Sequence, residues 1–236
     1  MLTVAMPAFN EVAQIAKSIR SVIDALDATG EHWELVVIDD GSSDGTHALV
    51  DAIAIRDPRV RLVRHPRNMG VGQAIASGLS KAHGTWFMVI PADLAMDLRD
   101  LKRYLAARDD LGVHSGNDRD AVAVVAGYTA TRPDYSMRRD VISWANRNAV
   151  ALLLGVHVRN PNYIHLFRVS ALEGPPFRFT GSAALFAEML RRAHTAGKIV
   201  EVPIRYLPRV AGTQTGAKWS LIAKTARDIV RLRLGI

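Results

Sequence analysis

The sequence of 236 residues contains no cysteine. Disulfide bonds and thiolate metal sites are therefore excluded, and this composition fits a reducing compartment. Charge-free runs are also short, well below the roughly 18 apolar residues that a membrane span needs. The first residues, Met1–Pro7, lack the basic region and apolar core of a signal peptide. We therefore expect a cytoplasmic protein.

Acidic residues are in the minority, with 23 Asp and Glu against 30 Lys and Arg, which gives a net charge of +7. Such an excess favours an anionic partner: nucleic acid, anionic lipid or a phosphorylated substrate. Nucleic acid is the least favoured of these, because the basic residues are spread along the chain and no recognition motif is present. The length suits one large α/β domain or two small ones.

Several common motifs are missing as well. There is no phosphate-binding loop ending in Gly-Lys-Ser/Thr. Gly70-Val-Gly72 lacks the third glycine of a dinucleotide fingerprint and follows the third strand, which argues against a dehydrogenase. The 8 histidines show no metal-ligand spacing. We expect His65, His83, His157 and His165 to be solvated or bonded to protein groups.

The stretch Thr85–Asp97 joins a short apolar run to acidic residues. Trp86–Ile90 predicts a strand buried on both faces, and Pro91 should end it because proline cannot donate to a sheet. Asp93 then follows the carboxyl end of a strand, where α/β sheets bind ligands. Alternatively, Asp93 or Asp97 caps a helical segment at Leu98–Leu105.

Strands and helices alternate through the first half of the chain. Strands are predicted at Leu2–Met6, Trp33–Ile38, Val60–Arg64 and Trp86–Ile90, and helices after an N-cap at Asn10, at Ala48–Ile55 and from Asn68–Ala74, with Val71, Ile75 and Leu79 as its apolar positions. This order predicts an α/β fold with a doubly wound, mostly parallel sheet flanked by helices.

Two adjacent aspartates, Asp39 and Asp40, end the second strand and precede the turn Gly41–Gly45. Adjacent carboxylates repel each other, but they can accept hydrogen bonds from a ligand's N–H or hydroxyl groups, as the ribose-binding acid of dinucleotide folds does. Ordinary turn chemistry is the alternative. A second polar strand end, Pro7–Glu11, favours the ligand interpretation.

Four motifs occur in a characteristic order: Val4–Glu11, Val36–Thr46, Asn68–Ala74 and Ile90–Asp93. Further likeness runs through Ala126–Arg132, Asn160–Arg168 and Glu201–Arg209. The chain thereby resembles the family 2 glycosyltransferases with the GT-A fold, and most closely their dolichyl-phosphate mannose synthase-like branch. The resemblance implies a single GT-A domain at residues 1–216, followed by a basic amphipathic helix at residues 217–236.

The resemblance also implies roles for particular residues. A nucleotide-sugar would be bound by Pro7, Asn10, Glu11, Asp39, Asp40, Gly70, Gly72, Ala74 and Asp93. The diphosphate or a phosphate-bearing acceptor would be bound by Arg132, Arg139 and Arg209. Asp93, Arg132 and Arg209 form the expected catalytic set, with Asp93 also the metal ligand.

The chain departs from the family pattern at the metal motif. Pro91 and Ala95 stand where the family has metal ligands, which leaves Asp93, with Asp97 as a second candidate, to hold Mg²⁺ or Mn²⁺. One or two carboxylates suffice for Mg²⁺ when substrate phosphates complete its shell. Asn160 or Asn162 replaces an acidic position, so a general base is missing unless Asp97 or Glu188 supplies it.

The resemblance therefore implies a transferase that moves a sugar from a GDP- or UDP-linked donor, with inversion, to a polyprenyl phosphate. Such an acceptor is already anionic and needs no base. The alternatives are a glycosyltransferase with a soluble acceptor and a non-catalytic nucleotide-sugar-binding relative.

The C-terminal segment predicts a helix with an apolar stripe that includes Trp219, Ile222 and Ile229 beside Lys224, Arg227 and Arg231. It either packs on the domain or lies in a membrane interface. The inner face of the membrane is thus the alternative location to the free cytoplasm. Asp109–Asp120 and Thr213–Ala217 are expected to be mobile loops, the second of them ordering over a bound nucleotide.

Overall fold

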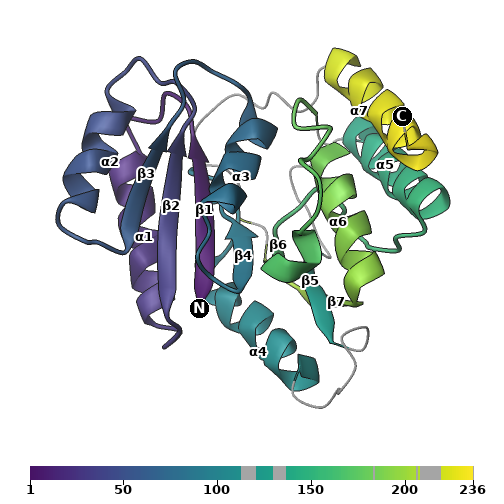
Figure 1. The fold of residues 1–236 in the computed structure, drawn as a ribbon, viewed down its shortest axis with the longest axis horizontal. Helices are drawn as coiled ribbons and strands as arrows, with labels where there is room; N and C mark the ends of the chain where they lie inside the picture. The colour runs from purple at the N-terminus through teal and green to yellow at the C-terminus, as the bar shows by residue number, and fades with distance from the viewer. Residues whose placement is uncertain (113–120, 130–136, 183, 206, 208–218, 236) are drawn as a thin grey trace.

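The computed structural model describes residues 1–112, 121–129, 137–182, 184–205, 207 and 219–235. Its centre is a seven-stranded sheet in the order β3-β2-β1-β4-β6-β5-β7 (Figure 1). The strands are β1 (Leu2–Ala8), β2 (Trp33–Asp39), β3 (Val60–Arg64), β4 (Trp86–Val89), β5 (Val122–Tyr128), β6 (His165–Arg168) and β7 (Lys198–Pro203). The helices are α1 (Ile15–Asp27), α2 (Thr46–Ala54), α3 (Val71–Ser80), α4 (Leu101–Gly112), α5 (Met137–Leu154), α6 (Ala184–Ala196) and α7 (Trp219–Leu234), with short 3₁₀ helices at Leu98–Asp100 and Val169–Leu172.

The sheet is parallel except at β6. Strands β3, β2, β1 and β4 pair in parallel, as do β5 and β7, whereas β6 is antiparallel to both β4 and β5. The carboxyl ends of the parallel strands therefore share one edge of the sheet, and the residues that precede β6 arrive at that same edge. The predicted α/β fold with a mostly parallel sheet is confirmed.

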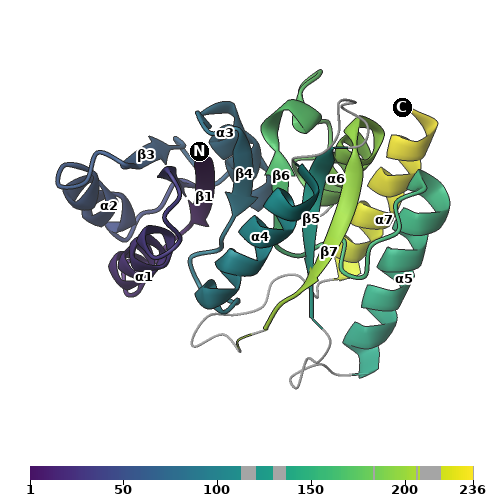
Figure 2. The ribbon, with the colours of Figure 1, turned by 90° about the horizontal axis from the view of Figure 1, so that it is seen from below.

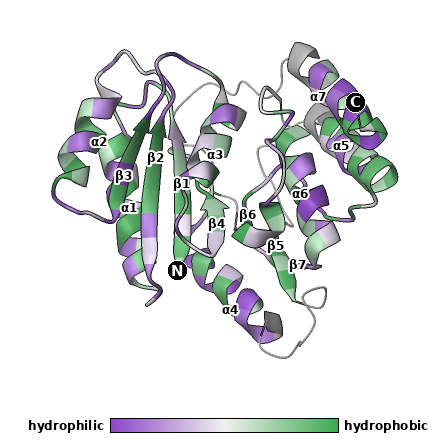
Figure 3. Ribbon diagram, in the orientation of Figure 1, coloured by the Kyte–Doolittle hydropathy of each residue, from purple (hydrophilic) through white to green (hydrophobic). Residues whose placement is uncertain are grey.

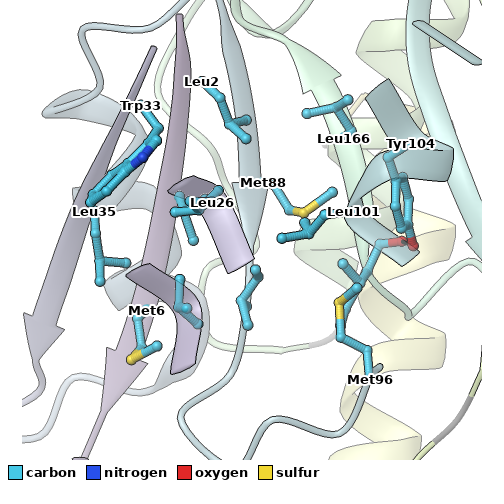
Figure 4. Close-up of a cluster of buried hydrophobic side chains, with 14 of the residues drawn as sticks. Leu2, Met6, Leu26, Trp33, Leu35, Met88, Met96, Leu101, Tyr104 and Leu166 are labelled. Carbon is cyan, nitrogen blue, oxygen red and sulfur yellow. Dashed lines mark hydrogen bonds between the residues drawn. The ribbon is translucent and has the colours of Figure 1, made fainter. Parts of the chain in front are cut away.

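Both faces of the sheet are covered by helices. One buried cluster contains side chains from α1, α2 and α4, and the other contains side chains from α3, α5, α6 and α7. Figure 4 shows part of the first cluster, where Leu26 and Tyr104 lie among strand side chains such as Leu2 and Met88. Burial on two faces explains why the central strands are apolar at successive positions (Figure 3).

Strand β1 is longer than predicted, because it continues through Pro7 to Ala8. Pairing with β4 stops at the Ala5–Val89 pair, whereas pairing with β2 continues to Ala8. Beyond Ala5 the β4 side of β1 no longer forms ladder pairs, so a proline without an N–H is tolerated at position 7.

Two other sequence predictions are corrected. Helix α1 begins at Ile15 with Gln14 at its N-cap, so Asn10 is not the cap. In α3, Val71 is 65% exposed rather than part of the apolar face, while Ile75 is buried.

The predicted loop Asp109–Asp120 begins inside a helix, since α4 continues to Gly112, and its remaining residues lie outside the described part of the chain. Thr213–Ala217 also lies outside the described residues.

Helix α7 packs against α5 and α6, and Figure 2 shows α5 and α7 side by side at one end of the sheet. Among its described side chains, Thr225, Asp228, Ile229 and Leu232 are buried. Packing on the domain was one of the two interpretations of this segment. Within the described residues, no helix combines the length and the apolar character needed to cross a bilayer.

Candidate functional site

The loops that follow β1 and β2 are bonded into one frame at the carboxyl edge of the sheet. The backbone N–H of Asn10 donates to Oγ of Ser42 at 2.9 Å, and Oδ1 of Asn10 accepts the N–H of Ser43 at 3.0 Å. The N–H of Glu11 donates to Oγ1 of Thr46 at 2.9 Å. Asn10 has φ of 56°, a left-handed conformation that few residues other than glycine adopt. These cross-loop bonds compensate the strain at Asn10.

Asp40 joins this frame to the loop before α3. Its carboxylate accepts hydrogen bonds from Nδ1 of His65 at 2.7 Å, from the N–H of Met69 at 2.9 Å and from the N–H of Gly70 at 2.8 Å. Nε2 of His65 is in turn 2.9 Å from Oγ of Ser77 in α3. Both oxygens of Asp40 are thus engaged by the protein, and the interpretation of His65 as a bonded partner is confirmed.

Asp39 has a different environment. Its Oδ1 accepts the N–H of Ser42 at 3.2 Å, but among the described residues its buried Oδ2 has no hydrogen-bond donor. Nε of Arg64 approaches Oδ2 only to 3.6 Å. A buried carboxylate oxygen without a donor is costly, and a ligand N–H or hydroxyl would remove that cost.

A cleft of about 320 Å³ opens beside Ser42 and Arg64, the residues that approach the two carboxylate oxygens of Asp39. It is lined by Gly41, Ser42, Arg64, His65 and Pro66. Gly41 has φ of 76°, and a Cβ there would lie 2.3 Å from the carbonyl carbon of Arg67. Only glycine therefore allows the chain beyond Asp40 to pass so close to the 67–68 backbone.

Gly70, Gly72 and Ala74 lie at the start of α3. Gly72 and Ala74 are buried. A Cβ on Gly72 would lie 2.1 Å from the carbonyl oxygen of Thr180, so the space beside Gly72 is filled by protein backbone. The small residue thus permits a close contact between α3 and the segment before α6.

Asp93 lies just beyond β4, as predicted from the sequence. It is half-buried, and its Oδ1 accepts the N–H of Ala95 at 3.3 Å. Leu94 beside it has φ of 49°, a second left-handed non-glycine residue at this edge of the sheet. Such strained positions cluster at functional sites.

Asp97 caps the 3₁₀ helix at Leu98–Asp100, which confirms the capping interpretation for this residue. Nη2 of Arg99 lies 2.7 Å from its Oδ2, and Nη2 of Arg205 lies 3.2 Å from the same oxygen. Hydrogen bonds from the Arg99 side chain hold the pKa of Asp97 below its usual value. Asp97 is therefore an ion-paired cap, which weakens the case for it as a metal ligand or a base.

No group of three or more His, Cys, Asp or Glu side chains within the described residues could hold a metal ion. Pro91 and Ala95 offer no side-chain ligand. Asp93 is the carboxylate of this segment that fits a cation whose other ligands come from a substrate diphosphate and water.

The other candidate base, Glu188, is buried and bonded. It accepts the N–H of Arg178 at 3.1 Å and pairs with Arg192 at 2.7 Å, one turn further along α6. Its interpretation as a member of an ion pair is confirmed, although the residue lies inside the protein rather than at the surface. Asn160 is half-buried, with Nδ2 3.4 Å from Oγ1 of Thr129.

The structure brings part of the predicted set together. Asn10, Asp39, Asp40 and Gly70 meet around the loop frame, whereas Asp93 follows β4, on the far side of β1 from β2. Pro7 is half-buried at the end of β1, and Glu11, also half-buried, accepts a hydrogen bond from the side chain of Gln14. Arg132 and Arg209 lie outside the described residues, and Arg139 lies in α5 with its side chain outside the described part.

Ser42 and Arg64 were not predicted to be site residues. The position of Arg64 could have been predicted from the sequence, because Arg64 ends a predicted parallel strand and therefore reaches the same sheet edge as Asp39. Ser42 was interpreted only as part of a turn.

Comparison with known proteins identifies relatives of this chain. Residues 3–115 match the family model Glycosyl transferase family 2. A dolichyl-phosphate beta-glucosyltransferase of Trichomonas vaginalis is 30% identical over 105 residues, covering 42% of this chain and 31% of that protein. The glycosyltransferase AglD of Haloferax volcanii is 27% identical over 213 residues, covering 88% of this chain and 33% of that protein. The chain thus spans about a third of the length of these curated relatives.

Among solved structures, glucosyl-3-phosphoglycerate synthase from Mycobacterium tuberculosis, in complex with Mn²⁺, UDP and glucosyl-3-phosphoglycerate, is similar. The TM-score is 0.65 at 20% identity, and the match covers 100% of this chain and 80% of that chain. This likeness shows that the two chains share the GT-A fold.

Proposed function

We propose, from the premise that the chain belongs to glycosyl transferase family 2 through residues 3–115, that it transfers a sugar from a UDP- or GDP-linked donor to an acceptor that carries a phosphate. The donor would lie along the carboxyl edge of β2, β1 and β4. The nucleoside would occupy the cleft beside Asp39, and the diphosphate and sugar would extend toward Asp93.

The observation that carries the donor assignment is the buried Oδ2 of Asp39, which has no hydrogen-bond donor among the described residues. A ring N–H of uracil or guanine, or a ribose hydroxyl, would supply the missing hydrogen bond. Arg64, which is 3.6 Å from this oxygen, is placed to contact the same ligand. Asp40 would contribute indirectly, by holding the Met69–Gly70 backbone next to the cleft.

The leaving group of this reaction is a nucleoside diphosphate, which gains negative charge as the glycosidic bond breaks. Cationic groups near it stabilise the transition state. A divalent cation at Asp93 would supply part of that charge, since the related synthase was solved with Mn²⁺ and UDP. We assign the rest to Arg132 and Arg209, which lie outside the described residues, and to Arg139.

A phosphate acceptor is favoured because the candidate bases are engaged elsewhere. Asp97 is ion-paired with Arg99 and Arg205, and Glu188 with Arg192. A hydroxyl nucleophile needs a base within hydrogen-bond reach, whereas a phosphate monoester is already an anion at neutral pH. Among the relatives, one acts on dolichyl phosphate and another makes glucosyl-3-phosphoglycerate. Polyprenyl phosphate is our first choice, and a soluble phosphorylated acceptor is the second.

The location proposed for the enzyme is the cytoplasm or the inner face of the membrane. Exposed side chains of α7 include Lys224, Arg227, Arg231 and Arg233. These cations would face anionic lipid if the acceptor is membrane-bound.

The test is nucleotide binding by wild type and by Asp39→Asn, followed as thermal stabilisation with UDP and GDP, each with and without Mn²⁺. A ligand that binds only the folded state raises the melting temperature. We expect stabilisation of the wild type by one nucleotide and at least a ~10-fold weaker affinity in Asp39→Asn, which corresponds to about 1.4 kcal/mol.

Asp51→Asn is the matched control, because Asp51 is exposed on α2 and undergoes the same chemical change. Transfer is then measured with the sugar of the stabilising nucleotide, using polyprenyl phosphate or 3-phosphoglycerate as acceptor. Equal nucleotide affinity in Asp39→Asn and wild type would remove the donor site from this cleft. Binding without turnover on either acceptor would point to the non-catalytic alternative.

A further inference from the structure

A second cleft, of about 330 Å³, lies between α5, the segment that follows it and the edge strand β7. It is lined by Arg147, Asn148, Ala151, His157, Val158, Arg159 and Glu201. We infer that this cleft is a binding subsite for a phosphate monoester group. Its assignment to the acceptor rests on the proposed function, but the binding site itself does not.

The cleft lies at the functional edge of the sheet. Arg159 precedes the antiparallel strand β6, whose amino end reaches the edge where β5 ends at Tyr128. In the strand order β4-β6-β5-β7, β5 and β7 are two and three strands away from β4. At ~4.8 Å per strand, β5 and β7 are on the order of 10–15 Å from β4, the strand that precedes Asp93. An acceptor molecule can span this distance.

Arg159 is held at two points while part of its guanidinium stays accessible. Its backbone N–H donates to Oε1 of Glu201 at 2.7 Å. The guanidinium carbon stacks over the ring of Tyr128, 4.0 Å from the centroid, and Nε is 3.6 Å from Oε2 of Glu201. The side chain remains 60% exposed. Stacking of this kind leaves the N–H groups at the guanidinium edge free to bind phosphate oxygens.

Arg147 supplies a second guanidinium from α5. It is exposed, and in the described part of the chain no carboxylate pairs with it. The exposed ring of His157 lies in the same lining. The positive charges of the two guanidinium groups exceed the single negative charge of Glu201, so the lining is positively charged even when His157 is neutral. A phosphate monoester, which carries ~1.5 to 2 negative charges near pH 7, complements this lining and accepts hydrogen bonds on three oxygens.

Apolar side chains flank the cleft on α5. Trp144 is 60% exposed and Leu152 is 84% exposed, and they lie one turn before and one turn after Asn148. The amide nitrogen of Asn148 donates to the carbonyl oxygen of Trp144 at 2.7 Å. A phosphate on a hydrocarbon chain would place its chain on these side chains, whereas a soluble phosphate ester would use only the cleft.

The experiment measures binding of two probes to the full chain by calorimetry, without nucleotide present. The probes are glycerol 3-phosphate and farnesyl phosphate, with farnesol as the uncharged comparison. We expect Arg147→Gln to weaken binding of both phosphate probes ~10-fold, because Arg147 contributes charge to the cleft and forms no ion pair with the described residues. Arg159→Gln should have at least the same effect. Arg56→Gln, an exposed arginine on the far side of the molecule beyond α2, is the matched control and should bind as wild type does.

Trp144→Ala distinguishes the two sources of phosphate. If the acceptor is a lipid, Trp144→Ala should bind farnesyl phosphate more weakly than wild type does and should bind glycerol 3-phosphate equally well. If the acceptor is soluble, the two probes should bind with equal affinity, both to wild type and to Trp144→Ala. Either pattern supports the subsite, provided that Arg147→Gln weakens binding and the melting temperatures of the variants match that of wild type.

Unchanged affinity of both probes in Arg147→Gln would overturn the inference, as would equal binding of farnesol and farnesyl phosphate. Affinity for UDP and GDP is measured in the same variants and should not change. Failure of the donor site therefore appears as absent nucleotide binding in wild type, and failure of this subsite appears only with the phosphate probes.

Discussion

Nδ1 of His65 lies 2.7 Å from the carboxylate of Asp40, and this contact separates the roles of two adjacent aspartates. Asp40 is bonded to His65 and to two backbone N–H groups of the loop before α3, while one oxygen of Asp39 stays without a donor among the described residues. Asp40 thus holds the loop before α3 in place, and Asp39 is the residue that we propose contacts a ligand.

The variant Asp40→Ala should lower the free energy of unfolding by about 3 kcal/mol, because it leaves two N–H groups and the His65 ring without their charged acceptor. Urea denaturation at neutral pH measures this change. Asp51→Ala, at an exposed position of α2, should lie within about 0.5 kcal/mol of wild type. A stability of Asp40→Ala equal to that control would show that the bonds to His65, Met69 and Gly70 do not stabilise the fold.

The variant Gly72→Ala should destabilise the protein by about 2 kcal/mol, since its new Cβ would lie 2.1 Å from the carbonyl oxygen of Thr180 and backbone must move. Thermal and urea unfolding measure the loss. Val71→Ala, one residue away at a position that is 65% exposed, serves as the control and should change stability little. If Gly72→Ala unfolds like wild type, α3 and the segment at Thr180 are less tightly packed than the structure shows.

The hydroxyl of Tyr104 is buried and donates to the carbonyl oxygen of Ile164 at 2.8 Å. Tyr104→Phe should therefore cost about 1 kcal/mol, because the carbonyl of Ile164 loses this donor and keeps the N–H of Gly127, at 3.2 Å. Tyr163→Phe removes a half-buried hydroxyl that donates to Ala95 at 3.1 Å and should cost less. A larger loss of stability in Tyr163→Phe than in Tyr104→Phe, measured by urea denaturation, would contradict the burial of the Tyr104 hydroxyl against β5.

His165 gives the protein a specific dependence on pH. Burial lowers the pKa of His165 to about 4, although Nε2 donates to the carbonyl oxygen of Pro161 at 3.2 Å. In the unfolded chain the pKa is about 6.5. Between these values the unfolded state binds a proton that the folded state does not, so stability is lost as the pH falls from about 6.5 to about 4. The loss reaches about 2 kcal/mol at pH 5, from ~1.4 kcal/mol for each pH step below 6.5.

The measurement is the free energy of unfolding at pH 7.5 and pH 5, for wild type and for His165→Asn. Other titrating groups are common to both proteins, so the difference between the two pH slopes isolates His165. Parallel slopes would mean that this ring is accessible to protons in the folded state.

The N-terminal half of the fold could be predicted from the sequence, because β1, β2 and β4 are largely buried and form mostly apolar runs that alternate with helical patterns. The edge strand β3 is only partly buried. The antiparallel β6 could not be predicted, since it is four residues long and its partners in β4 and β5 are distant in the chain. Asn10 was misassigned as an N-cap for a physical reason. Asparagine suits both a cap and a left-handed turn, and the bonds to Ser42 and Ser43 select the turn.

The position of the candidate site was also predictable, since strand ends of a parallel sheet meet at one edge. The different hydrogen-bond environments of Asp39 and Asp40 were not, because the two residues are chemically identical neighbours. They depend on where His65 lies after β3 folds against β2. The roles of Arg132, Arg139 and Arg209 remain predictions.

The position of β4 in the sheet has a consequence for the order of folding. The pairs β1–β2 and β2–β3 join consecutive β-α-β units, whereas Trp86 of β4 pairs with Leu2 on one side and with Arg168 on the other, both far away in the chain. Closing such long loops is entropically costly and slow. We therefore expect β1 to β3 to gain protection against amide hydrogen exchange before β4 and β6 join them. The strand end at Asp39 would then form before the strand end at Asp93.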